Sequence, residues 1–297
     1  MLLVATIALP AAAGAAQRTF VSAKNGNDAL NCTNTAPCRS FQRAVNVVAA
    51  GGEVIPLDSG GYGRFDIYQS VTVSAPPGIY AGITATAGQV DAIHVAAAMP
   101  VSVVLRGLSV TTTAMGTGGI YFSAVAGSTT RIESCSIDGG LYGVFALSAG
   151  TIVTQSNITR AFSGVESMGS ASARARVLVD KVRVTDCNEG IAAFDYSDIA
   201  VRDSVIVKNT WGLVASANNA GTDPHIIAEG CTVSRNGTGV GIGNFPTGHI
   251  FVSNSAITDS TTMGIQLLPG AFVDSFGNNT VVDNAGNETF TNTVAQK

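Results

Sequence analysis

Four polar residues of types used in acid–base chemistry recur at one position of a repeating pattern in the second half of the chain. An imidazole beside a carboxylate transfers protons near neutral pH, and a guanidinium binds anions. We interpret the four as a candidate catalytic group for which no metal or cofactor is expected. The alternative is a polar ladder of turn residues without function. The four residues are Arg176, Asp198, His225 and His249.

A second group of residues suits contact with sugars. Exposed aromatic rings stack on sugar faces, and two carboxylates can flank a glycosidic bond. The segments that lead to the first group add two aspartates. The resulting candidate substrate-binding residues are Tyr142, Phe145, Glu166, Glu189, Trp211, Asp195 and Asp223. The alternative is that they are ordinary surface residues.

A repeat must position both groups. A small or apolar residue, one intervening residue and then Val or Ile recur at spacings of 21 to 27 residues. Self-similarity at this period indicates a solenoid. Within each unit apolar residues alternate with period two, which predicts strands. The first residues of the eight units are Leu108, Cys135, Ser156, Val182, Ser204, Cys231, Ser255 and Asn279.

The pattern therefore predicts an all-β fold, a parallel β-helix of about ten coils in which like residues form columns. Phe145 and Glu166 should point outward on adjacent coils, and Cys135 and Cys231 should be small buried residues. A polar column five residues into the units predicts a sharp turn, where asparagine adopts a left-handed backbone and bonds to the next coil. Glycine should then let the chain leave the turn. This column is Cys187, Asn209, Asn236, Ser260 and Asn284.

Most of the other charged residues can be explained by the repeat itself, without a role in function. Stacked coils bring equivalent positions together, so residues of alternating sign should form ion-pair ladders on a solvated face. The expected ladders are Arg106 with Glu133, Asp180 with Arg202 and Glu229, Lys181 with Asp203, Asp186 with Lys208, and Arg235 with Asp259.

Composition limits the function classes. Charged residues make up 12% of the chain, the net charge is −4, and no basic tract is present, which argues against nucleic acid and anionic membranes as partners. An apolar leader ending in small residues predicts a signal peptide at 1–16, although no Lys or Arg precedes Arg18. The β-helix domain should then span 17–297, without a membrane span. We expect a secreted or periplasmic protein with a disulfide between Cys32 and Cys38.

The N-terminal stretches RTFVSAKNGNDALNC and PCRSFQRAVNVVAAGGEVIPLDSGGYG, followed by SVTV, resemble the start of pectin-lyase-like right-handed β-helix proteins of the exported bacterial type. The resemblance covers roughly residues 18 to 290. It implies a right-handed helix whose first coil is capped by a short helix, expected at 40–50 with Ser40 as its N-cap.

That family contains polysaccharide lyases, glycoside hydrolases and adhesin-like proteins without chemistry, so fold alone does not give the function. The Asn-Thr-Asp, Asp-Asp, Gly-His-Gly and Arg-Ile-Lys motifs of the polygalacturonase type do not occur here. We therefore expect a scaffold that binds polysaccharide or a cell-surface glycan along its side without a recognisable catalytic motif. The alternatives are a divergent lyase or hydrolase with its site at the first group, and a structural or adhesive surface protein.

Overall fold

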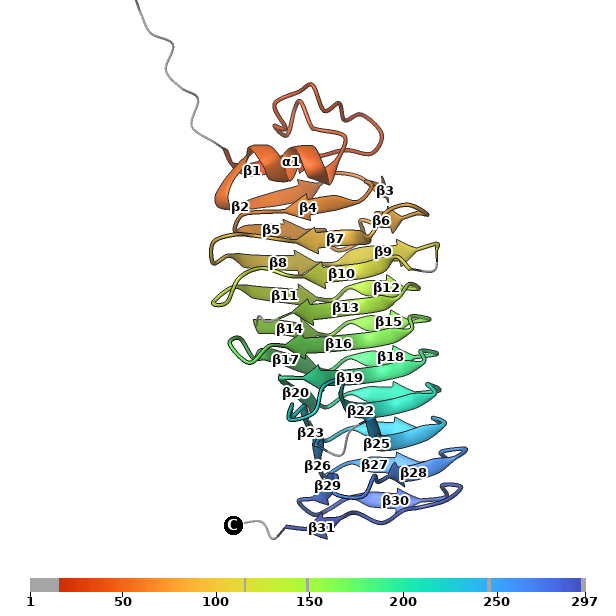
Figure 1. The fold of residues 1–297 in the computed structure, drawn as a ribbon. Coiled ribbons are helices and arrows are strands. Elements are labelled where there is room, and N and C mark those ends of the chain that lie inside the picture. Colours follow the sequence, from red (N-terminus) through yellow and green to blue (C-terminus); the bar gives the residue numbers. More distant parts are fainter. Residues whose placement is uncertain (1–15, 115, 148–149, 245–246, 295–297) are drawn as a thin grey trace, which may run out of the picture.

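The computed structural model describes residues 16–114, 116–147, 150–244 and 247–294. They form a parallel β-solenoid in which the chain visits three sheets in turn, A, B and C, in every coil (Figure 1). Residues 1–15 of the expected signal peptide lie outside the described residues. Within the described ranges, no helix is long and apolar enough to cross a membrane.

The strands of each sheet stack in chain order. Sheet A contains β1 (Ala16–Val21), β2 (Val48–Pro56), β5 (Val71–Ser74), β8 (Ser102–Arg106), β11 (Thr129–Glu133), β14 (Gly150–Thr154), β17 (Ala175–Asp180), β20 (Ser197–Arg202), β23 (His225–Glu229), β26 (His249–Ser253), β29 (Phe272–Ser275) and β31 (Asn292–Thr293). Sheet B contains β3 (Gly60–Gly61), β6 (Ala81–Ala85), β9 (Leu108–Thr112), β12 (Ser136–Asp138), β15 (Asn157–Thr159), β18 (Arg183–Thr185), β21 (Val205–Val207), β24 (Thr232–Ser234), β27 (Ala256–Thr258) and β30 (Thr280–Val282). Sheet C contains β4 (Phe65–Ile67), β7 (Asp91–Val95), β10 (Gly118–Phe122), β13 (Tyr142–Leu147), β16 (Ser163–Gly169), β19 (Glu189–Asp195), β22 (Trp211–Ala217), β25 (Thr238–Asn244) and β28 (Met263–Gln266).

Sheet C sets the number of complete coils. It has nine strands among the described residues, so nine coils contain a strand of every sheet, fewer than the ten expected. Alternation along each strand turns one set of side chains inward, where aliphatic residues stack coil upon coil. On sheet A this buried column is Leu105, Ile132, Val153, Val179, Val201, Ala228 and Val252. Cys135 and Cys231 are buried free thiols, as expected.

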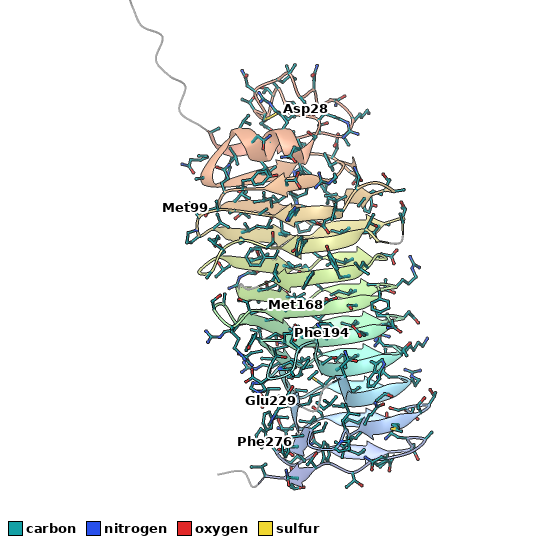
Figure 2. The ribbon with its side chains drawn as sticks, viewed as in Figure 1. Asp28, Met99, Met168, Phe194, Glu229 and Phe276 are labelled. Carbon is teal, nitrogen blue, oxygen red and sulfur yellow. A yellow bond between two sulfur atoms is a disulfide. The ribbon has the colours of Figure 1, made fainter. Side chains whose placement is uncertain are left out.

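The helix α1 (Phe41–Val47) lies at the N-terminal end of the solenoid (Figure 1). Phe41, Ala44 and Val45 are buried, which places the apolar face of the helix on the first strands. The Ser40 hydroxyl accepts from the Arg43 amide and donates to Asp28, a residue of the N-terminal loop (Figure 2). The helix is shorter than the expected 40–50 because the backbone becomes extended at the residue after Val47 and β2 begins there.

The turn from sheet B to sheet C corrects part of the turn prediction. The asparagine column does bond from coil to coil: the Cys187 amide donates to Asn209 Oδ1 at 2.9 Å, and the Asn209 amide donates to Asn236 Oδ1 at 2.9 Å. The left-handed residues, however, are those directly before this column. They are Asp186, Lys208, Arg235, Asp259 and Asp283, and Arg160 adopts the same conformation one coil earlier. The asparagine side chains are therefore buried cross-coil braces, and the sharp bend falls one residue earlier.

The glycine that follows the turn also has a different role from the one expected. A Cβ on Gly190 would lie 2.5 Å from the carbonyl oxygen of Gly212, and a Cβ on Gly212 would lie 2.4 Å from that of Gly239. The glycines are required because successive coils approach too closely there for any side chain. Cys32 and Cys38 are joined by a disulfide in the N-terminal loop.

Candidate functional site

The four residues of the first candidate group lie side by side on the outer face of sheet A. Arg176 is the register partner of Asp198, Asp198 of His225, and His225 of His249. The Arg176 side chain is exposed and the other three are partly exposed. The four polar side chains therefore form an outward ladder across four strands, β17, β20, β23 and β26.

Arg174 links this ladder to the loop before β23. Its Nε donates to Asp198 Oδ2 at 2.7 Å, and its Nη1 donates to Asp223 Oδ1 at 2.7 Å. His225 Nδ1 lies 3.2 Å from Asp198 Oδ1 and 3.2 Å from Arg174 Nη2. One guanidinium thus forms ion pairs with two carboxylates and contacts the imidazole between them. Arg176, which the sequence suggested for this role, is not part of the contact network.

Electrostatics in the cluster favour the ionised form of Asp198. Burial tends to raise the pKa of Asp198, but the hydrogen bond and positive charge of Arg174 outweigh it, so the pKa lies below its usual value. The same contacts raise the pKa of Arg174. Partial burial lowers the pKa of His249, and the neighbouring His225 adds to this effect. The rings of His225 and His249 meet edge to face, with centroids 5.4 Å apart.

This arrangement can orient an imidazole for proton transfer. Asp198 and Arg174 hold the Nδ1 edge of His225, and its Nε2 lies 3.9 Å from Asp223 Oδ2. Among the described residues, no group of three or more His, Cys, Asp or Glu side chains could hold a metal ion.

Asp195, predicted as a substrate-binding residue, is instead the centre of a loop. It is 6% exposed and accepts from the amides of Asn218 and Asn219 at 2.8 and 3.2 Å and from the Thr222 hydroxyl at 3.0 Å. These contacts fold the segment that carries Asp223 to Arg174. Asp195 therefore positions the site without facing it.

Two hollows of about 270 Å³ each adjoin the polar ladder on the outer face of sheet A. Gly150 lines the first and Ala200 lines the second, and Arg176 lines both. Apolar walls come from Ile152 and Leu178 in the first hollow, and from Ile227 and Phe251 in the second. Asp198 and His225 border the second hollow. We call the two hollows with Arg176 between them the sheet A groove.

The expected ion-pair ladders are mostly wrong. Arg106 and Glu133 form an ion pair at 2.7 Å. The other expected pairs occupy adjacent coils, yet none of them approaches within 4.0 Å in the part of the chain that the structure describes. Long exposed side chains gain little from pairing in water, so register alone does not bring them together. An unexpected pair joins Arg160 and Asp138.

The aromatic residues of the second group lie on sheet C, away from the ladder. Phe145 and Glu166 are outward register partners, as expected. The rings of His94, Tyr121 and Phe145 stack on one another at centroid distances of 5.0 and 5.3 Å, so rings cover both faces of Tyr121 and one face of each outer ring. Tyr142 is 7% exposed, and its hydroxyl donates to the buried carboxylate of Asp91. Tyr142 therefore offers little surface to a sugar.

Two carboxyl groups follow this aromatic stack. The Ser163 hydroxyl donates to Glu189 Oε2 at 2.8 Å. Burial raises the pKa of Glu166 to about 7, and the negative charge of Glu189 adds to the rise against the effect of Ser163. Burial also raises the pKa of Glu189. Trp211 is the register partner of Glu189 and lies flat across the next coil, where a Cβ on Gly241 would meet the indole at 2.7 Å.

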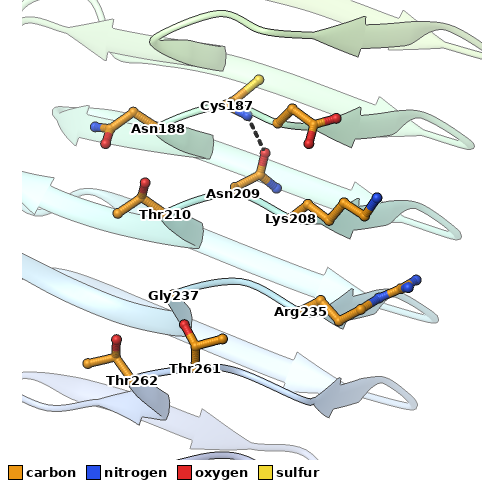
Figure 3. Close-up of a pocket in the computed structure, with 10 residues that line it drawn as sticks. Cys187, Asn188, Lys208, Asn209, Thr210, Arg235, Gly237, Thr261 and Thr262 are labelled. Atoms are coloured by element: carbon orange, nitrogen blue, oxygen red, sulfur yellow. Dashed lines mark hydrogen bonds between the residues drawn. The ribbon is translucent and has the colours of Figure 1, made fainter.

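Another hollow, of about 780 Å³, lies elsewhere, along the turn from sheet B to sheet C (Figure 3). Lys208 and Arg235 project from successive turns along one side, and Thr210 and Thr262 lie on the other. The side chains are exposed and do not converge on one point, because every coil presents its own turn residues there. This surface lacks the linked charges of the sheet A groove.

Arg174 is the functional residue that sequence reasoning missed. It lies two residues before Arg176, as Asp223 lies two residues before His225. A comparison of the residues that lie two positions before each member of the ladder would have predicted that Arg174 and Asp223 form an ion pair. The loops that precede the strands differ in length, which hid this second column.

Comparisons with known proteins agree with the fold. Residues 118–289 match the family described as the right handed beta helix region. Pectate lyase Pel9A shares the fold with a TM-score of 0.64 and 15% identity, over 94% of this chain and 78% of that one. Carrot pectin methylesterase has a TM-score of 0.56 and 13% identity, over 94% and 88% of the two chains. XylC, solved with xylose, has a TM-score of 0.52 and 10% identity, over 88% and 67%.

No curated protein matches the sequence significantly. At such identities the structural likeness shows the scaffold and not the chemistry.

Proposed function

The chain belongs to the right-handed β-helix family, and from that premise we propose that it is an exported protein that binds polysaccharide along the outer face of sheet A. The observation that carries the proposal is the sheet A groove, where two hollows lie beside a ladder of linked polar side chains. Binding sites for small and extended ligands combine apolar walls with a few placed polar groups. Pectate lyase, pectin methylesterase and the xylose complex of XylC, all of this fold, are named for carbohydrate ligands or substrates, which supports this ligand class.

Sheet C supports the proposal by contrast. Its outward rings are stacked on each other, and its two glutamates are partly desolvated, so this face offers less free surface to a ligand than sheet A does. Phe145 and Trp211 thus become weaker candidates for sugar contact than the sequence suggested.

A second candidate function is a divergent polysaccharide lyase or hydrolase. The observation that favours it is the hydrogen bond between Asp198 and His225 at the border of the second hollow, an arrangement able to move a proton. Both carboxylates of the cluster, Asp198 and Asp223, are engaged by Arg174, whereas glycoside hydrolysis uses two carboxyl groups that face the scissile bond. Binding without a committed catalytic step therefore remains the first proposal.

The test is incubation of the purified chain with acidic and neutral polysaccharides, following co-sedimentation, new reducing ends and unsaturated products together. Binding without product is expected, with weaker binding in Ile227→Gln and unchanged binding in Phe162→Gln. These two side chains are about equally exposed, at 50% and 52%, but only Ile227 lines the groove. Product that disappears in His225→Gln would establish the enzyme instead, and absence of both binding and product would overturn the proposal.

A further inference from the structure

The floor of the sheet A groove is aliphatic, although it faces outward. Strands with one solvated face normally place polar residues there. Here five successive outward register partners are apolar, and Ile227 is 50% exposed. They are Ile152, Leu178, Ala200, Ile227 and Phe251. Exposed aliphatic side chains in such a row favour a ligand that brings apolar groups of its own.

Small residues create the two hollows. Gly150 has no side chain, and Ala200 has only a methyl group between the longer side chains of Leu178 and Ile227. Gly150 on β14 and Ala200 on β20 are separated by one strand, β17, so they lie two coils, or about 10 Å, apart along the axis. They are also offset by two positions along the strands, because Gly150 is in register with Arg176 and Ala200 with Leu178. An extended polysaccharide chain that runs obliquely across the strands would place alternate sugars at the two hollows.

Arg176 supplies a hydrogen-bond donor between the hollows. Its side chain is exposed and lines both of them. Among the described residues it makes no ion pair, because Arg174 takes the contacts to Asp198 and Asp223. A guanidinium without a carboxylate partner is available to a carbonyl oxygen of a ligand.

We infer that the sheet A groove selects O-acylated polysaccharide, with acyl groups of alternate sugars in the hollows at Gly150 and Ala200 and ester carbonyl oxygens on Arg176. This inference rests on the proposed function and narrows its ligand class. A bare hydroxyl placed on the apolar floor would lose water without gaining a partner there. A short acyl chain fills the same space with apolar contacts and leaves its carbonyl at the polar border.

The test compares acetylated xylan with the same preparation after mild alkaline deacetylation, measured as binding isotherms on the purified chain. We expect the acetylated form to bind at least tenfold more tightly. Ala200→Leu fills the second hollow and should reduce this ratio to near one. Gly150→Val should fill the first hollow and reduce the ratio in the same way. A Cβ at this position lies 3.6 Å or more from its nearest neighbours, so the substitution fits without a clash. Thr154→Leu, outward on β14 but outside both hollows, is the matched control and should keep the ratio.

Three results separate the two proposals. Equal binding of both xylans overturns the acyl preference and leaves glycan binding intact. A preference that survives Ala200→Leu and Gly150→Val also overturns it, because the acyl groups would then bind elsewhere. If neither xylan binds, the same comparison on acetylated and deacetylated glucomannan decides, and loss of all binding there overturns both proposals.

Discussion

The outer faces of sheets A and C belong to the same coils, but their carboxyl groups lie in opposite electrostatic environments. On sheet A, Asp198 is paired with Arg174, which holds the pKa of this carboxyl below its usual value. On sheet C, Glu166 is flanked by Phe145 and Ala192, and burial raises its pKa to about 7. Sheet A leaves hollows beside its charges, whereas sheet C covers its own surface with stacked rings.

This difference shows that an outward-pointing side chain in a solenoid does not by itself indicate a ligand-binding surface. Members of both candidate groups face outward, among them Phe145 and Glu166 on sheet C, but in the comparison of these two described faces polar groups, free apolar surface and concave space coincide on sheet A. Changes on sheet C should therefore alter stability more than binding, and changes on sheet A the reverse. The following predictions test that division, from the largest expected effect to the smallest.

The largest effect is expected at the buried pair on sheet C. Tyr142→Phe removes the phenol that donates to Asp91, whose other carboxylate oxygen already lacks a partner among the described residues. An unsatisfied buried carboxyl should lower the free energy of unfolding by about 2–3 kcal/mol, measured by urea denaturation. Glycan binding should not change. A loss of stability below about 0.5 kcal/mol would show that the hydrogen bond between Tyr142 and Asp91 contributes little to the stability of sheet C.

Glu166 should make stability depend on pH. Its pKa is raised from 4.5 to about 7 in the folded chain. Between these values the folded state keeps a proton that the unfolded state has lost, so the free energy of unfolding falls as pH rises, and then levels off. Glu166→Gln should remove this pH dependence. Above pH 7 its free energy of unfolding should be higher than that of the parent by about 1–2 kcal/mol. Parallel stability curves for the two proteins between pH 4.5 and 8 would contradict the desolvated environment of Glu166.

Arg174→Ala should separate binding from stability on sheet A. Asp198 and Asp223 lose their shared cation, and the loop that carries Asp223 loses its anchor. We expect binding to weaken about tenfold, or about 1.4 kcal/mol, with a smaller change in stability because the cluster is partly exposed. Arg183→Ala, an exposed arginine on sheet B, is the control for loss of one positive charge. Equal effects of the two substitutions on binding would point to net charge rather than to the cluster.

The smallest effect is expected at the exposed charges that the sequence placed in ladders. Lys181→Ala should change the free energy of unfolding by less than about 0.5 kcal/mol, because no ion pair joins Lys181 to Asp203 in the described structure. Thermal unfolding of the parent and the variant at low and high salt would measure this change in stability. A larger loss that salt abolishes would restore the ladder interpretation.

The sequence predicted those features that depend on constant spacing. Arg176, Asp198, His225 and His249 were placed in one ladder because each precedes a unit by six residues, and their pairing in register follows from that. The cross-coil bonds of Asn209 and Asn236 follow in the same way.

Features that depend on side-chain reach could not be read from spacing. Tyr142 extends over Gly118 to Asp91, two coils away, so its burial has no local signal. Arg174 enters the site from a loop of variable length and displaces Arg176 from the predicted contacts. Asp195 faces its own loop and not the groove because its carboxylate satisfies backbone amides there.

The most direct test of the central claim is the affinity of one bound polysaccharide for Ile227→Gln and Phe162→Gln, measured by titration calorimetry under the same conditions. The two side chains are similarly exposed, but Ile227 lies in the groove and Phe162 precedes β16 of sheet C. If polysaccharide binds along sheet A, Ile227→Gln should weaken binding about tenfold and Phe162→Gln should leave it unchanged. Equal affinities of both variants and the parent, or a loss confined to Phe162→Gln, would contradict the assignment of the ligand face.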